Sequence, residues 1–138
     1  MSEKSRQKKA DMTVSEAKTI LDKNAFCQEG SLRESLCEDC FFSDEYFWQF
    51  YDCLIALAED VKENGLTVEI TAKILGVYNR IIQMFMFHFD PNDLVEIRNF
   101  PINYPNYLER LNGAVDAYLR GVFVGEELYE LQRPRDIQ

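Results

Sequence analysis

Apolar residues recur at alternating spacings of three and four along most of the chain, which is the period of an α-helix with one buried face. The clearest apolar seam consists of Phe47, Phe50, Leu54, Leu57 and Val61. Ser43 supplies an N-cap hydroxyl before this seam, and two acidic residues follow it at the positive end of the helix dipole. Gly65 fits the left-handed position that ends a helix. The pattern predicts a long helix over residues 43–64.

Two further long helices are predicted, over residues 67–89 and 105–121. Thr67 can cap the first of them, which carries two apolar stripes and is therefore expected to be the central, most buried helix. Its β-branched residues leave a strand over part of residues 81–87 as the competing prediction, although the length of the periodic pattern favours a helix. The seam of the second consists of Leu108, Leu111, Val115, Tyr118 and Val122. Gly121 is its stop or a kink.

Shorter helices are predicted around these three. The run Thr13-Val-Ser-Glu16 is a capping box, in which the two polar side chains satisfy each other's backbone amides, and it begins a helix over about residues 13–24. Ser31 begins another short helix. The run Asp90-Pro-Asn-Asp93 places an acidic cap before a proline at the first helical position and predicts a short helix to about residue 99.

These elements predict an all-α fold without internal repeats. A length of 138 residues corresponds to one domain. The expected architecture is a single-domain helical bundle of three long helices (about 43–64, 67–89 and 105–121) with an N-terminal helix (about 13–24) and short helices, one of them a turn at 126–131. The expected organisation is a flexible basic tail over 1–11, the helical domain over 12–131 and a frayed C-terminus over 132–138.

The chain has neither the apolar run of a signal peptide nor a stretch long enough to span a bilayer. We therefore expect a cytoplasmic protein without a membrane partner. In that compartment Cys27, Cys37, Cys40 and Cys53 are expected to be thiols. The pair Cys37 and Cys40 forms a CxxC motif, but no second pair stands at the spacing of a zinc site, so no metal is expected. A redox or metal module at this motif is the third class of function considered.

The net charge of −9 argues against direct, sequence-independent binding of nucleic acid, which depends on neutralising phosphates. The charge is also local, because residues 34–61 contain eight acidic residues and no base. Asp52, Glu59 and, more loosely, Glu45 share the helix face opposite the apolar seam. A solvated face that only favours solubility is one explanation, and a docking surface for a basic protein is the other.

Aromatic residues are interleaved with these acids, a composition that is typical of interaction hot spots. Tyr46 and Trp48 lie nearly opposite one another on the predicted helix, so at least one of them is expected to face outward. The predicted partner-binding residues are Glu38, Asp39, Asp44, Glu45, Tyr46, Trp48, Asp52, Glu59 and Asp60.

The sequence shows no catalytic motif. His88 is the single histidine, which limits schemes that pair a nucleophile with a base, and neither a phosphate-binding glycine loop nor an HExxH motif is present. We expect His88 to be a helix-end residue bonded near Asp90. Asp90 and Asp93 are explained as helix caps rather than calcium ligands. A non-enzymatic protein without catalytic residues or cofactors is therefore expected.

Several runs resemble the small immunity proteins of bacterial polymorphic-toxin and contact-dependent growth inhibition systems, most closely the immunity protein 41 family. The matching runs are Gly30-Ser-Leu-Arg-Glu34, Phe42-Ser-Asp-Glu-Tyr-Phe-Trp48, Leu57-Ala58, His88-Phe-Asp-Pro-Asn-Asp-Leu94 and Tyr107-Leu-Glu-Arg-Leu111. The resemblance implies a cytosolic toxin inhibitor that binds one cognate toxin C-terminal domain and blocks its activity.

Two function hypotheses from different classes remain. The first is an immunity protein that neutralises a basic toxin domain, for example a nuclease, through the acidic, aromatic-containing surface. The second is a non-enzymatic helical adaptor or regulatory subunit that binds a partner through an apolar groove. Binding through the acidic surface should weaken steeply as salt rises, whereas binding through an apolar groove should depend on salt only weakly.

Overall fold

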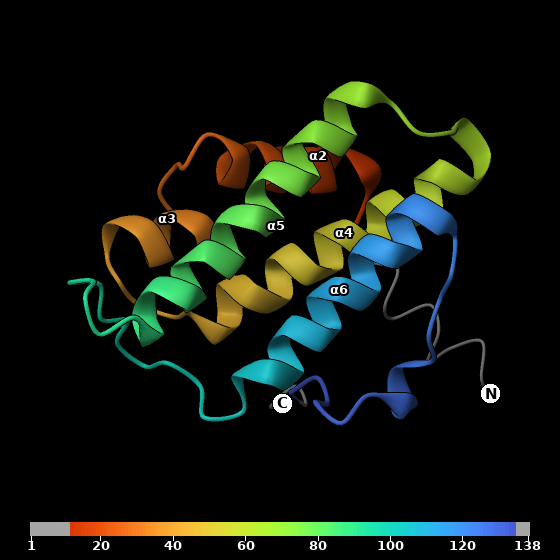
Figure 1. Cartoon of the computed structure of the whole chain (residues 1–138). Coiled ribbons are helices and arrows are strands. Elements are labelled where there is room, and N and C mark those ends of the chain that lie inside the picture. Colours follow the sequence, from red (N-terminus) through yellow and green to blue (C-terminus); the bar gives the residue numbers. More distant parts are fainter. Residues whose placement is uncertain (1–11, 135–138) are drawn as a thin grey trace.

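The computed structural model describes residues 12–134, and these residues form an all-α bundle (Figure 1). The helices are α2 (Val14–Ala25), α3 (Leu32–Glu38), α4 (Asp44–Asn64), α5 (Val68–Phe89) and α6 (Tyr104–Arg120), followed by the 3₁₀ turn η1 (Glu126–Leu128). The predicted fold class is confirmed, and each of the three long helices lies where the apolar periodicity places it. The strand considered over residues 81–87 is excluded, because this stretch belongs to α5.

The helix ends follow the capping residues in the sequence. Thr13 and Glu16 form the predicted capping box. The hydroxyl oxygens of Ser43 and Thr67 accept hydrogen bonds from the backbone amide of the third residue of α4 and of α5. Gly121 ends α6 in the left-handed conformation, with φ 71°. Local chemistry therefore accounts for where these helices begin and end.

Helix α4, rather than α5, is the central helix. Figure 1 shows α4 running through the middle of the bundle, and its main contacts are with α2 on one side and α6 on the other. Its seam residues Phe47, Phe50, Leu54 and Leu57 are buried. Helix α5 buries mainly the stripe of Ile74, Val77, Ile81 and Met84, whereas Phe89, on its other apolar stripe, is exposed. The expectation that α5 is the most buried helix was wrong, because α6 packs on α4 and leaves one side of α5 uncovered.

The predicted helix over residues 90–99 is absent, and the segment forms turns instead. The Asp90 carboxylate accepts a hydrogen bond from the Asn92 amide, and the Asp93 carboxylate accepts one from Val95, both at 2.9 Å. These side chains bond two residues ahead, in the geometry of an Asx turn, and this competes with helix formation. His88 Nδ1 accepts a hydrogen bond from the Ile97 amide at 3.0 Å, so the expected bond near Asp90 was also wrong.

The segment after these turns connects to the link between α3 and α4. Arg98 donates its amide to the Cys40 carbonyl at 2.7 Å, and the Phe42 amide donates to the Arg98 carbonyl at 3.0 Å. These bonds form an isolated parallel bridge between Phe41 and Arg98. A backbone pairing across more than fifty residues therefore replaces the local hydrogen bonds of the predicted helix.

The chain after α6 is mostly extended, and the predicted turn at 126–131 is shorter than expected, being confined to η1. We refer to residues 122–134 as the C-terminal segment. Residues 132–134 were predicted to fray, but Arg133 forms an ion pair with Asp52 of α4. The basic tail over 1–11 and residues 135–138 lie outside the described residues. Within residues 12–134, no helix has the length and apolar character needed to cross a membrane.

Candidate partner-binding site

The acidic residues of α4 lie on the side of the helix that faces away from the core. Glu45 and Glu59 are exposed and Asp52 is half-buried, whereas the seam on the opposite side is buried. The predicted division of α4 into an apolar and an acidic face is therefore confirmed. How much of this charge is available to a partner depends on the neighbouring elements.

A groove of about 630 Å³ runs along this acidic face, between α4, the start of α2 and the C-terminal segment. Among residues 12–134, five carboxylates line it and Arg133 is the one base in its lining. The carboxylates belong to Asp52, Glu59, Asp60, Glu63 and Glu126, and the apolar lining includes Met12, Val14, Ile55, Phe123 and Val124. The groove therefore combines negative charge with apolar surface.

Arg133 already has partners inside the chain. Its Nη1 lies 2.7 Å from the Asp52 carboxylate, and its Nη2 lies 3.4 Å from Glu126. Burial raises the pKa of Asp52, and the attraction of Arg133 opposes this only in part. The negative charge that remains for a partner is therefore centred on Glu59, Asp60 and Glu63. Among these, Glu59 has only an exposed pairing with Lys62 at 3.7 Å, a kind worth about 0–1 kcal/mol.

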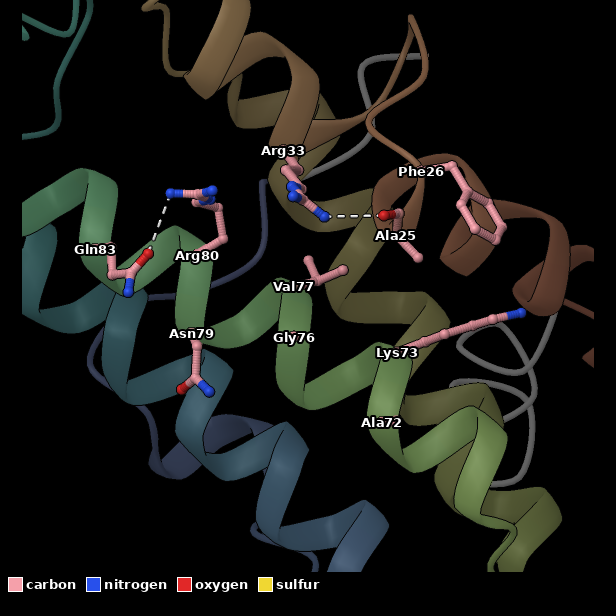
Figure 2. Close-up of a pocket in the computed structure, with 10 residues that line it drawn as sticks. All are labelled: Ala25, Phe26, Arg33, Ala72, Lys73, Gly76, Val77, Asn79, Arg80 and Gln83. Atoms are coloured by element: carbon pink, nitrogen blue, oxygen red, sulfur yellow. Dashed lines mark hydrogen bonds between the residues drawn. The ribbon is translucent and has the colours of Figure 1, made fainter.

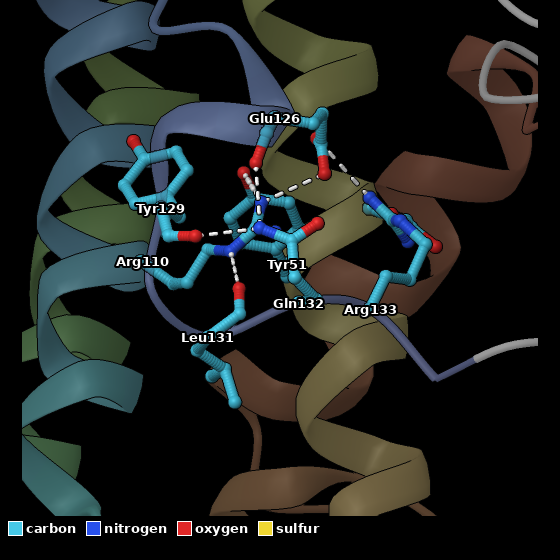
Figure 3. Close-up of polar contacts among 8 residues, drawn as sticks. Tyr51, Arg110, Glu126, Tyr129, Leu131, Gln132 and Arg133 are labelled. Atoms are coloured by element: carbon cyan, nitrogen blue, oxygen red, sulfur yellow. Dashed lines mark hydrogen bonds and ion pairs between the residues drawn. The ribbon is translucent and has the colours of Figure 1, made fainter.

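The C-terminal segment is held in place by a buried arginine, as Figure 3 shows. Arg110 of α6 is 0% exposed. Its Nη1 donates to the Tyr51 hydroxyl at 2.9 Å and pairs with Glu126 at 2.8 Å, while Nε donates to the Leu131 carbonyl at 3.0 Å. The guanidinium also lies 4.3 Å from the centroid of the Tyr129 ring. A buried cation requires such partners, so Arg110 fixes the wall of the groove to α4 and α6.

The Glu126 carboxylate is ionised in this arrangement. Burial raises its pKa, but the hydrogen bond and charge of Arg110, together with Arg133, outweigh burial and lower the pKa below its ordinary value of 4.5. Burial also raises the pKa of the Tyr51 hydroxyl to about 12, so it remains protonated. Behind the groove, the positive charges of Arg110 and Arg133 are therefore paired with the carboxylates of Glu126 and Asp52.

The two predicted aromatic contact residues differ in exposure. Trp48 is 8% exposed and lies against both guanidinium groups, 5.1 Å from its ring to Arg110 and to Arg133. Trp48 therefore offers almost no surface to a partner, because the C-terminal segment and α6 cover the side of α4 on which it lies. Tyr46 is half-buried and keeps some exposed surface, in agreement with the expectation that one of the pair faces outward.

The remaining predicted residues lie outside the groove. Asp44 accepts a hydrogen bond from the Tyr107 hydroxyl at 2.7 Å and so helps to join α4 to α6. Glu38 and Asp39 are exposed at the end of α3. Burial raises the pKa of the neighbouring Glu34 carboxyl, and the charges of Asp39, Glu29 and Glu38 add to this. The structure thus brings Asp52, Glu59 and Asp60 together and separates them from Glu38 and Asp39.

Sequence reasoning missed Glu63 and the whole network of Arg110, Glu126 and Arg133. One signal was present, because Arg110 stands in helical register with the small residues Ala114 and Ala117, which leave room for a large buried side chain. Apart from Tyr51, the hydrogen-bond partners of Arg110 come from the C-terminal segment, which has no periodicity. No pattern in that segment predicts where it packs.

The four cysteines are free thiols. Cys53 is buried, its Sγ lies 3.2 Å from the Ala17 carbonyl, and burial raises the pKa of its thiol to about 12. Over residues 12–134, no group of three or more His, Cys, Asp or Glu side chains is placed to hold a metal ion. The site therefore consists of a groove with carboxylate and apolar walls.

Comparisons with protein-family models, with curated proteins and with solved structures find no match to this chain. The resemblance to immunity proteins accordingly stays a prediction from the sequence.

Proposed function

We propose that this protein is a non-enzymatic inhibitor of the immunity-protein type, which binds a basic toxin domain in the cytoplasm through the acidic groove on α4. The observation that carries the proposal is the charge balance of the groove. Among the residues that the structure describes, its five carboxylates face one base, and that base is already paired within the chain. A positively charged partner would supply further counter-charge and would be steered toward this face.

The shape of the groove supports a protein segment as its ligand. A volume of about 630 Å³ accommodates several side chains, and the apolar lining from Ile55 and Phe123 would pack against the aliphatic stems of lysine or arginine. The cationic ends of these side chains would meet Glu59, Asp60 and Glu63. A nuclease is the toxin class that fits this chemistry, because a nuclease binds its substrate in a basic cleft.

The test is co-expression with the toxin domain encoded beside this gene. Cells that make both proteins should grow, whereas cells that make the toxin domain alone should not. The combined variant Glu59→Gln, Asp60→Asn and Glu63→Gln should slow association about ten-fold or more and weaken protection. The matched control is Glu29→Gln, Glu96→Gln and Glu109→Gln, which removes the same charge from exposed residues outside the groove. Equal protection by both variants would contradict the proposal, as would a neighbouring gene that encodes no toxin domain.

A helical adaptor is the second candidate function, and the apolar lining of the same groove favours it. The two candidates differ in how binding responds to salt. Screening over about 10 Å at 0.1 M salt should reduce the association rate of a basic toxin steeply, but it should leave apolar docking almost unchanged. Measuring the association rate over a salt series decides between them.

A further inference from the structure

A second groove lies on a different face, between α5 and the corner that joins α2 to α3 (Figure 2). Its volume is about 470 Å³, within the range of about 300–1,000 Å³ that is typical of small-molecule sites. Of the residues that the structure describes, three bases and two carboxamides line this groove, and no carboxylate does. These polar side chains belong to Arg33, Lys73, Arg80, Asn79 and Gln83. In a protein with a net charge of −9, a groove lined in this way is a local exception.

The three cations differ in whether their charge is already compensated. Lys73 pairs with Asp22 at 2.7 Å. Arg33 donates Nη1 to the Ala25 carbonyl at 2.9 Å, and its Nε is buried without a hydrogen-bond partner. Arg80 donates only to the neutral Gln83 side chain, at 3.2 Å. Across the described part of the chain, therefore, neither guanidinium group in this groove has a carboxylate partner.

The charges of both guanidinium groups reach the Cys37 thiol. Burial raises the pKa of the Cys37 thiol, and the positive charges of Arg80 and Arg33 both oppose this increase. Figure 2 shows the Arg80 side chain directed toward Gln83 and the Arg33 side chain directed toward Ala25, with Asn79 on the same side of the groove as Arg80. An anion bound between Arg33 and Arg80 would meet two cations that lack a carboxylate partner.

The floor and the other end of the groove are apolar. Gly76 of α5 forms the floor, and a Cβ added there would meet no atom within 4 Å, so the groove is open above the helix backbone. Phe26 lies at the far end and is 62% exposed. The Lys73 Nζ lies 5.4 Å from the centroid of its ring. An exposed aromatic ring beside a cationic groove provides a surface on which a planar ring can stack.

We propose that this groove binds a small organic phosphate of the mononucleotide class. The phosphate is held by Arg33 and Arg80, because the guanidinium fork matches the oxygens of a phosphate group. The base stacks on Phe26 at the far end, and the carboxamides of Asn79 and Gln83, which lie beside Arg80, offer further donors to the phosphate. This site goes beyond the proposed inhibitor function, because it lies on another face and requires no protein partner.

The test is calorimetric titration of the full chain with adenosine monophosphate, ribose 5-phosphate and inorganic phosphate. Affinity should fall in that order. Arg80→Gln should weaken binding of the nucleotide about ten-fold or more, because a charged hydrogen bond is lost. Phe26→Ala should lower the affinity for the nucleotide to that for ribose 5-phosphate. It should leave the affinity for ribose 5-phosphate unchanged. Lys62→Gln removes the same charge from a residue outside the groove and should change none of the three affinities.

Neither test variant should disturb the fold, since Arg80 has a single side-chain hydrogen bond and Phe26 is exposed. The Gly76 amide resonance should shift on nucleotide binding in the wild type and should shift less in Arg80→Gln. The proposal is overturned if no ligand binds, or if Arg80→Gln binds the nucleotide as tightly as the wild type. Inorganic phosphate binding as tightly as the nucleotide would overturn the assignment to a mononucleotide.

Discussion

Arg110 and Glu126 form an ion pair, with Nη1 and Oε1 2.8 Å apart, in which the guanidinium group is completely buried and the carboxylate comes from a three-residue 3₁₀ turn. This contact joins α6 to the C-terminal segment, which forms one wall of the acidic groove. The stability of the fold and the shape of the proposed binding site therefore depend on the same pair of residues.

Glu126→Gln should destabilise the protein by about 3 kcal/mol, because Arg110 would remain buried without its counter-charge. The effect should depend on pH. The pKa of Glu126 is lowered in the folded state, so its contribution is fully present above 4.5 and is lost as pH falls through the folded pKa. Urea unfolding followed by circular dichroism should give a large difference from wild type at neutral pH and a small one in acid. A difference that stays constant into acid would contradict this account.

Asp52→Asn should change the free energy of unfolding by no more than about 1 kcal/mol, much less than Glu126→Gln does. Burial raises the pKa of Asp52 more than Arg133 lowers it, so ionised Asp52 gives less net stability than its short contact with Arg133 suggests. Because the folded pKa is raised, wild-type stability should gain from this residue as pH falls toward 3.8. The same unfolding series measures this effect, and a loss as large as that of Glu126→Gln would show that the Arg133 pair outweighs burial.

Two glycine substitutions should change the stability of the fold in opposite directions. A Cβ at Gly113 would overlap the Tyr129 hydroxyl, so Gly113→Ala should force Tyr129 away from Arg110 and cost about 1–3 kcal/mol. A Cβ at Gly76 meets open space, so Gly76→Ala should gain about 0.5–1 kcal/mol through helix propensity. Thermal unfolding compares the two. In a Tyr129→Ala background the effect of Gly113→Ala should become stabilising, and a persisting loss there would refute the role given to Tyr129.

Cys53 should be the last thiol to react with an alkylating reagent in the native protein. Its thiol is buried and has a pKa of about 12, whereas Cys27, Cys37 and Cys40 are partly exposed. Peptide mass spectrometry after a short exposure in mildly alkaline buffer should find Cys53 unmodified, and prior unfolding in urea should make all four equally reactive. Labelling of native Cys53 at the rate of Cys40 would show that this part of the core opens readily.

The helices were predictable from the sequence because their signals are local. Ser43 and Thr67 cap helices within a few residues of themselves, and the seam of α4 depends only on spacing. The prediction of a helix at 90–99 was wrong because an aspartate such as Asp90 or Asp93 can either cap a helix or close a turn, and here both close turns. The distant bonds to Cys40 and Phe42 favour the turn, and no local pattern reveals them.

The candidate site was predictable only in part, for the same reason. Spacing placed Asp52 and Glu59 on one face of α4, as the structure confirms. It gave no indication that Arg133 would neutralise Asp52 or that Trp48 would be covered, because both effects come from the C-terminal segment. Contacts across about eighty residues carry no periodic signal.

The position of Glu126 and Arg133 late in the chain has a consequence for the order of events during synthesis. A ribosome that has released only the residues up to Arg120 has exposed α2 to α6, yet Arg110 still lacks its carboxylate partner and the groove lacks one wall. A nascent chain therefore cannot present the acidic groove until its last dozen described residues have emerged. Formation of the groove therefore follows the emergence of the C-terminal segment rather than the folding of the helices.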